Sequence, residues 1–197
     1  MKIKKILLLS IFVILTGCVG YSSTGVLGTG VSIALDPRTL GTQIDDSVMQ
    51  QNLRGKLISL NSKNFLSVKT KVLDGRIFLT GKVDSVEEKL KITKLAWEIK
   101  GARSVKNDLQ IKEKFSFKRA AKDVLITSQL RAALISNKRI KSVNYNIDTY
   151  KKKVYVYGIA SNEQERKEVI KEAKEILDVE EVITSIFLVE DLRVLKK

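Results

Sequence analysis

The sequence predicts an α+β protein made of two tandem αββαβ sandwiches, each with two helices on a three-stranded mixed sheet. The first observation is a repeat: Leu53–Ser59 (LRGKLIS) matches Leu130–Ser136 (LRAALIS), 77 positions later, and this offset continues without a gap. The second observation is the order of apolar periodicities in each copy, which runs helix, strand, strand, helix, strand. A repeat of this length is domain-sized, so it indicates a tandem duplication and not a solenoid.

The second copy, residues 122–190, defines the first helix most clearly. Asp123 is expected to cap a helix that ends at Ser136, because Asp is a favoured N-cap residue. Apolar residues recur along this helix at four-residue spacing and are expected to face the core: Ile126, Leu130 and Leu134.

Two strands, a second helix and a third strand follow. Alternating apolar residues predict the first two strands, on either side of a turn at 150–153 (YKKK): Val143, Tyr145 and Ile147, then Val154, Val156 and Gly158. Asn162 is expected to cap the second helix. Residues 182–188 are then expected to close the sheet.

The first copy, residues 45–112, follows the same path. A linker at residues 113–121 joins it to the second copy, and residues 191–197 form a basic tail. Gly81 and Gly158 occupy equivalent mid-strand positions, where glycine usually permits the close approach of another element. We expect the helix of the same copy, or the other copy, to approach there, so both glycines are predicted to be structural.

The start of the chain is typical of a bacterial lipoprotein signal. Residues 1–17 contain three lysines and then an apolar run, Ile6–Leu15, that is too short to span a bilayer and matches a secretory signal. Leu15–Cys18 (LTGC) resembles a lipobox, which implies cleavage before Cys18 and acylation of that residue, with palmitate among its chains. The alternatives are an uncleaved anchor and a free thiol. Residues 18–44 are rich in Gly, Ser and Thr and are predicted to form a flexible tether.

The composition argues against most enzyme classes. The chain has no histidine and one cysteine, which removes Ser-His-Asp and Cys-His catalysis and the usual zinc sites. We therefore expect no catalytic residue, metal or cofactor. A net charge of +14 favours an anionic partner. No nucleic-acid-binding motif is present, so the predicted partner is an anionic phospholipid membrane.

The strand motifs resemble the BON-domain family. Ile77–Val83 (IFLTGKV) and Val105–Leu109 (VKNDL) carry the family pattern in the first copy, and Val154–Ala160 (VYVYGIA) carries it in the second, where Thr184 replaces the Asn. With the lipobox and Asp36–Asp46 (DPRTLGTQIDD), the whole chain resembles outer-membrane lipoproteins with two BON domains. This resemblance implies a periplasm-facing, non-enzymatic protein that binds phospholipid and supports envelope integrity.

One helix face of the second copy is the candidate lipid-binding surface. The helix that ends at Ser136 is apolar beyond its core face, and basic residues follow it. The predicted phospholipid-binding residues lie opposite the core face or in this basic stretch: Val124, Leu125, Ser128, Arg131, Ala132, Ile135, Lys138 and Arg139. The equivalent face of the first copy is more polar.

Two alternatives remain open. The apolar face of this helix could pack on the first copy, which would leave the basic residues merely solvated. The protein could also be a lipid-tethered interaction scaffold that docks on outer-membrane assembly proteins or cell-wall enzymes. A glycan hydrolase with paired carboxylates is disfavoured because no such pair stands out.

Replacing Cys18 with Ala is expected to abolish acylation and release the protein from the outer-membrane fraction, because the acyl chains are the predicted anchor. Metabolic labelling with a fatty acid and membrane fractionation would check this. A variant that is still acylated and still cleaved before residue 18 would contradict the lipobox assignment.

Overall fold

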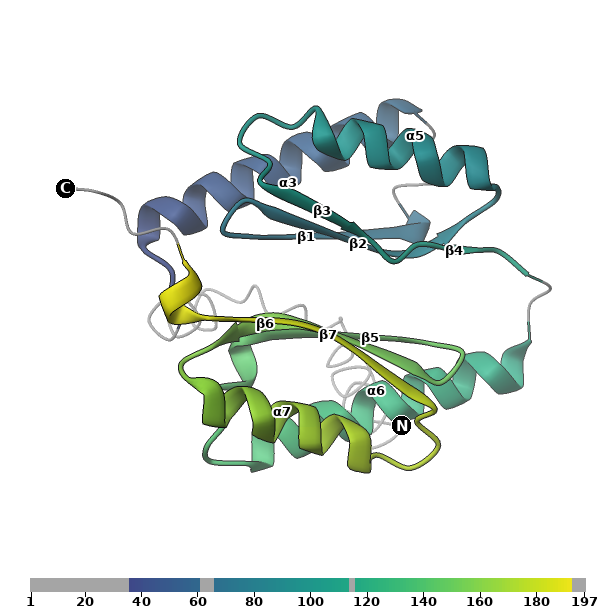
Figure 1. Ribbon diagram of the computed structural model, residues 1–197. Coiled ribbons are helices and arrows are strands. Elements are labelled where there is room, and N and C mark those ends of the chain that lie inside the picture. The colour runs from purple at the N-terminus through teal and green to yellow at the C-terminus, as the bar shows by residue number, and fades with distance from the viewer. Residues whose placement is uncertain (1–35, 61–65, 114–115, 193–197) are drawn as a thin grey trace, which may run out of the picture. The chain divides into compact units, whose positions relative to one another are not determined.

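The computed structural model describes residues 36–60, 66–113 and 116–192, which fold as two α+β units and confirm the predicted class (Figure 1). The second unit has the predicted αββαβ order and three strands, whereas a short additional strand gives the first unit a four-stranded sheet. The first unit consists of α3 Leu40–Leu60, β1 Val68–Leu73, β2 Arg76–Val83, α5 Val86–Trp97, β3 Ser104–Asn107 and β4 Gln110–Ile111. The second consists of α6 Phe117–Ser136, η2 Ser142–Asn144, β5 Tyr145–Tyr150, β6 Lys153–Ala160, α7 Glu163–Glu175, β7 Glu181–Leu188 and η3 Val189–Asp191.

Both sheets are mixed. In the first unit, β2 pairs antiparallel with β1 and parallel with β3 and β4. In the second unit, β6 pairs antiparallel with β5 and parallel with β7. Each pair of helices packs on one face of its own sheet (Figure 1), and a separate apolar core fills the space between them. As predicted, the Asn162 side chain caps α7 by accepting a hydrogen bond from the Glu165 backbone N–H (2.9 Å).

The first helix of each unit begins earlier than the sequence predicted. Helix α6 starts at Phe117 behind the N-cap Ser116, so the second half of the predicted linker is helical. Helix α3 starts at Leu40, so the end of the predicted tether is helical too. Asp123 is therefore not the N-cap of α6, because it lies more than a turn inside the helix.

Asp123 instead holds the β5–β6 turn. Its carboxylate accepts hydrogen bonds from the backbone N–H groups of Lys151 (3.0 Å) and Lys152 (2.9 Å). Both lysines have positive φ (51° and 60°), as a two-residue type I′ hairpin turn requires. The Asp123 carboxylate therefore pairs with the two backbone N–H groups at the tip of the β5–β6 turn.

The first unit repeats this arrangement with a buried carboxylate. Asp46 accepts hydrogen bonds from the backbone N–H groups of Asp74 (2.6 Å) and Gly75 (2.8 Å), whose φ values are 52° and 74°. The sequence match between Asp46 and Asp123 thus reflects one interaction made twice. We call this interaction the aspartate clamp.

Arg38 extends the clamp of the first unit. Its guanidinium donates to Asp46 (2.5 Å) and to Asp36 (2.5 Å). Burial alone would lower the pKa of Arg38, but the hydrogen bonds and charges of Asp36 and Asp46 raise it above its ordinary value. The DPRTLGTQIDD motif therefore has a structural role, because it attaches the segment before α3 to the first unit.

At Gly81 and Gly158, a side chain would clash with the start of the paired strand. A Cβ on Gly81, which has φ +111°, would lie 2.1 Å from the Ser67 carbonyl oxygen. A Cβ on Gly158 would lie 2.4 Å from the Tyr145 ring and 2.6 Å from the Asn144 carbonyl oxygen. The expectation that the packed helix of the same copy, or the other copy, approaches these glycines is therefore wrong. The close atoms belong to the start of the paired strand, at Ser67 just before β1 and at Asn144–Tyr145 where η2 meets β5.

A third apolar cluster covers the sheet faces that point away from the helices. It contains side chains of both sheets within the compact unit formed by Leu35–Lys197: Leu73, Phe78, Tyr155, Tyr157 and Ile159. The rings of Phe78 and Tyr157 lie 4.7 Å apart between centroids, and the Tyr157 hydroxyl donates to Asp108 (2.7 Å). Burial and this hydrogen bond raise the pKa of Tyr157 above its ordinary value.

Replacing Gly158 with Leu is expected to destabilise the second unit by about 1–3 kcal/mol, because the new side chain overpacks a filled site. Thermal or urea unfolding would measure the loss. Gly55→Ala is the matched control, since a Cβ on Gly55 meets nothing within 4 Å inside α3. It should add about 0.5–1 kcal/mol. Unchanged stability in the Gly158 variant would contradict the packing described above.

Candidate functional site

The orientation of α6 is fixed from its inner side. Ile126, Leu130 and Leu134 are buried in the core of the second unit, as predicted. Asp123 lies on the same side and holds the hairpin turn. With 3.6 residues per turn, Val124, Leu125 and Ile135 then lie on the side away from the sheet.

The candidate lipid-binding residues are all exposed. Of the larger apolar ones, Val124 is 66% exposed, Leu125 55% and Ile135 72%. The smaller and the charged candidates are exposed as well: Ser128, Arg131, Ala132, Lys138 and Arg139. The exposed side of α6 is therefore a continuous strip from Val124 to Ile135. We call this strip, together with Lys138 and Arg139 just after the helix, the α6 face.

The α6 face is longer than the sequence predicted. Phe117 is 77% exposed and Ala121 is also exposed, and they precede Val124 by two turns and one turn on the same side of the helix. They were missed because residues 113–121 were predicted to be a linker. The signal that identifies them is Ser116, an N-cap residue followed by side chains at helical spacing.

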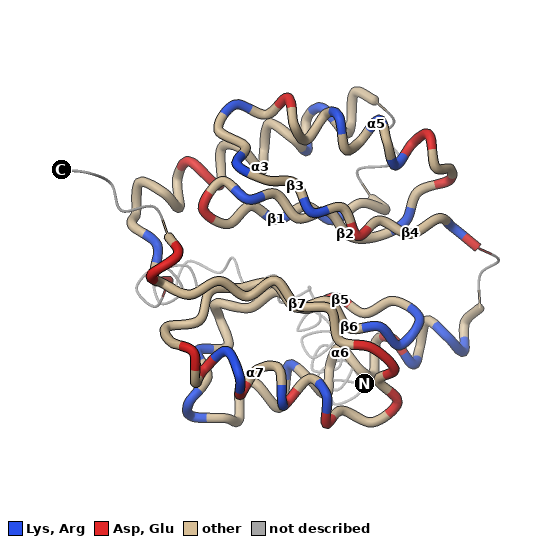
Figure 2. The backbone as a smooth tube through the Cα atoms, viewed as in Figure 1, with Lys and Arg blue, Asp and Glu red and all other residues tan. Residues whose placement is uncertain are grey.

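Positive charge accompanies the α6 face. Helix α6 carries four basic residues and one acidic residue, whereas α7 carries four basic and five acidic ones. Two of the four on α6 are ion-paired, Arg119 with Glu113 (3.5 Å) and Lys122 with Asp178 (3.1 Å). Figure 2 shows basic residues along the first turns of α6 and on the following hairpin, and mixed charges on α7. The charge of the second unit is therefore uneven.

Ion pairs neutralise part of the predicted basic stretch. Lys151 pairs with Glu113 (2.5 Å) and Lys152 with Glu180 (2.8 Å), and Lys153 pairs with Glu181. Arg139 pairs with Glu168 (2.8 Å). Lys138 and Arg131 have no ion-pair partner in the described part of the chain, so they are the better candidates for an anionic ligand.

A groove of about 740 Å³ lies beside α6. Val124, Ser128 and Arg131 line it from the helix, and Lys69 and Lys82 line it from the first unit. Lys69 pairs with Asp148 (2.6 Å), and the Lys82 ammonium lies 4.6 Å from the centre of the Tyr150 ring. The groove therefore brings further cations next to the α6 face.

The equivalent face of α3 is less polar than the sequence indicated. Because α3 starts at Leu40, it adds Leu40 and Ile44 to the exposed Val48 and Ile58. Its charges are balanced, with two acidic and two basic residues. The two first helices thus differ more in charge than in apolar content.

The alternative in which the α6 face packs on the first unit does not match the contacts. Phe117, Val124, Leu125 and Ile135 are exposed even with both units present. The contacts between the units run between the two sheets instead. They include the third apolar cluster, the Lys69–Asp148 ion pair and Lys82 over the Tyr150 ring.

Three other expectations concern anchoring and metals. Cys18 and the signal lie outside the described residues. Among the helices that the structure describes, none has the length and apolar character needed to cross a bilayer. Within residues 36–60, 66–113 and 116–192, no group of three or more acidic, His or Cys side chains is arranged to hold a metal ion.

Comparisons with known proteins agree with the repeat. The family model described as BON domain matches residues 45–113 and 122–189. The outer membrane lipoprotein DolP of Haemophilus influenzae is 29% identical over 82% of this chain and 83% of its own length. An uncharacterized protein of Anaplasma centrale, encoded in the gshII 5′ region, is 36% identical over 63% of this chain and 83% of its own length. A 21 kDa hemolysin of Actinobacillus pleuropneumoniae is 24% identical over 66% of this chain and 68% of its own length.

Proposed function

Because the chain belongs to the BON domain family and carries two BON domains, we propose that it is a periplasm-facing outer-membrane lipoprotein that binds anionic phospholipid through its second domain. In this proposal it is anchored by Cys18, has no enzymatic activity and supports envelope integrity. The similarity to an outer membrane lipoprotein from Haemophilus influenzae supports the location.

The observation that carries the lipid proposal is the α6 face. It combines four large exposed apolar side chains on a helix with an excess of positive charge. A helix of this kind lies in the plane of a membrane, with its apolar side chains at the boundary between head groups and acyl chains. Several large apolar side chains exposed on one helix indicate a surface that a membrane or a partner protein covers.

Binding would combine two contributions of similar size. Each apolar side chain that the membrane buries fully contributes about 1.5–3 kcal/mol, and less where burial is shallow. Each basic residue near an anionic surface contributes about 1 kcal/mol. Arg131 and Lys138 are placed to make that contribution, and the groove beside α6 offers Lys82 as a further cation. The Cys18 anchor would hold the domain near the membrane and raise its effective concentration there.

The second candidate function is a lipid-tethered scaffold for envelope proteins. The exposed apolar side chains of α3, on a helix with balanced charges, favour it for the first domain. A protein partner would tolerate neutral charge balance, whereas an anionic membrane favours positive charge.

Changing Leu125 and Ile135 together to Glu should weaken binding to anionic vesicles without lowering the melting temperature, because both side chains are exposed and outside the core. Co-sedimentation with phosphatidylglycerol-containing vesicles and thermal unfolding, measured on one sample lacking residues 1–18, would check this. Wild-type binding should also weaken with salt, since screening acts over about 10 Å at 0.1 M.

The matched control is Val48→Glu with Ile58→Glu, which places the same charges at the repeat-equivalent, exposed positions of α3. This control should still sediment with anionic vesicles. Equal loss in both double variants, or a lower melting temperature in the α6 variant alone, would count against the α6 face as the lipid-binding surface.

A further inference from the structure

A second strip of apolar side chains lies on the outer side of α5 in the first domain. Val86 is 63% exposed, Leu90 64% and Trp97 54%. Leu90 follows Val86 by four residues and Trp97 follows by eleven, about one and three turns, so the three side chains share one face. Ile92 and Ala96 point the other way and are buried. We call this surface the α5 face.

The fold itself does not require these side chains to be apolar. At the repeat-equivalent positions of α7, 77 residues later, the second domain has Glu163, Lys167 and Lys174. The two helices pack on equivalent sheets, yet only α5 exposes apolar side chains at these positions. The α5 face is therefore specific to the first domain, which indicates that a binding partner covers it.

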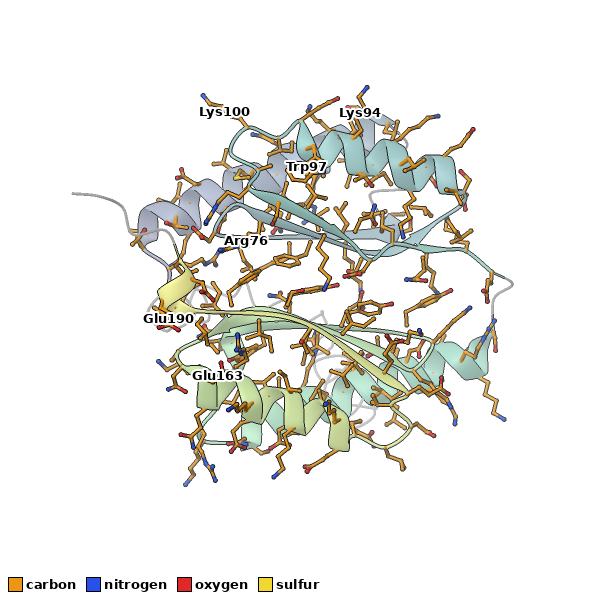
Figure 3. All side chains as sticks on the ribbon, in the orientation of Figure 1. Arg76, Lys94, Trp97, Lys100, Glu163 and Glu190 are labelled. Atoms are coloured by element: carbon orange, nitrogen blue, oxygen red, sulfur yellow. The ribbon has the colours of Figure 1, made fainter. Side chains whose placement is uncertain are left out.

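The charges around the α5 face indicate that the binding partner is anionic. Lys91, Lys94 and Lys100 are exposed and have no ion-pair partner among the described residues. Figure 3 shows Lys94 and Lys100 extending from the helix layer to the side away from the sheet. The acidic residues of the helix are Glu87, which is exposed, and Glu88, which accepts a hydrogen bond from the Asp84 backbone N–H (2.7 Å). The C-cap Glu98 is also exposed, and it pairs with Lys56 of α3 (3.2 Å).

Tryptophan beside lysine is the combination that prefers the head-group region. The indole ring is apolar with one polar N–H, so it is enriched where membrane meets water. Lysine side chains place their stems along apolar surface while the ammonium group reaches the phosphates. An acidic protein surface would complement the charge of the lysines, but it would not account for the exposed indole ring of Trp97.

We propose that the α5 face is a second contact site for anionic phospholipid, on the first domain and independent of α6. This inference rests on the proposed lipid-binding function and extends it from α6 to α5. Trp97 would then lie among the head groups whenever the α5 face contacts an anionic membrane.

Trp97 is the only tryptophan in the chain, so its fluorescence reports on this site alone. The acylated full chain would be reconstituted into vesicles of phosphatidylcholine alone, or of phosphatidylcholine with phosphatidylglycerol. The emission of Trp97 should shift to shorter wavelength in the anionic vesicles only, and brominated lipid should quench it there. High salt should reverse both effects.

Leu90→Glu should abolish the shift and the quenching. Lys167→Gln is the matched control, because it makes the same change in net charge at the repeat-equivalent, exposed position of α7. It should leave the Trp97 signal unchanged. Both substitutions lie outside the core, and equal melting temperatures would verify that the fold is intact.

The Leu125→Glu, Ile135→Glu variant separates this inference from the proposed function. It should keep the Trp97 shift, while co-sedimentation of the form lacking residues 1–18 becomes weaker. A wild-type protein whose Trp97 shows no shift or quenching, or shows both equally in neutral vesicles, overturns the α5 inference and leaves the α6 proposal standing. A shift that requires an added envelope protein and not anionic lipid also overturns it.

Discussion

The aspartate clamp is the interaction on which the rest of each domain depends. A carboxylate on the first helix accepts two hydrogen bonds from the tip of the first hairpin, through Asp46 in one domain and Asp123 in the other. A neutral amide has one acceptor oxygen and could not satisfy both N–H groups in the same geometry. Each buried N–H left unpaired would cost about 1–3 kcal/mol.

The clamp also determines which surfaces face outward. It fixes the rotation of α6 about its axis, since Asp123 must face the hairpin while Ile126, Leu130 and Leu134 face the core. The third apolar cluster covers the other face of both sheets, and the outer sides of the helices stay exposed. The exposed strip from Phe117 to Ile135 therefore follows from the same constraint that holds the domain together.

Much of this fold is predictable from sequence, and the errors have physical causes. Periodicity located both cores, but it placed Asp123 at a helix terminus because Asp favours N-caps as well as turn contacts. The hairpin partner of Asp123 is 28 residues away in sequence, so local pattern does not identify it. The mid-strand glycines were expected to face another element, but their close neighbours are the residues at the start of the paired strand, which periodicity does not identify. The candidate surface was predicted from the outward residues of α6, whereas Phe117 was missed with the first turn of the helix.

The two domains share a backbone and differ in the side chains that they expose. Helix α6 is apolar and basic outside, α7 is polar, and α5 is apolar at positions where α7 is charged. A duplicated fold can diverge in this way because outward positions contribute little to stability, so each helix can acquire its own partner. Gly158 and Gly81, by contrast, stay glycine because the backbone leaves no room there.

The most direct measurement of the central claim is the depth of the α6 face in a membrane. A single nitroxide would be attached at Ser128→Cys in a chain whose Cys18 is replaced by Ser, with a reference label at Lys167→Cys on α7. On anionic vesicles, the label at residue 128 should become more accessible to oxygen and less accessible to a water-soluble nickel chelate, while the label at residue 167 stays in water. A label at residue 128 that remains as accessible to the nickel chelate as it is in solution would contradict membrane contact by the α6 face.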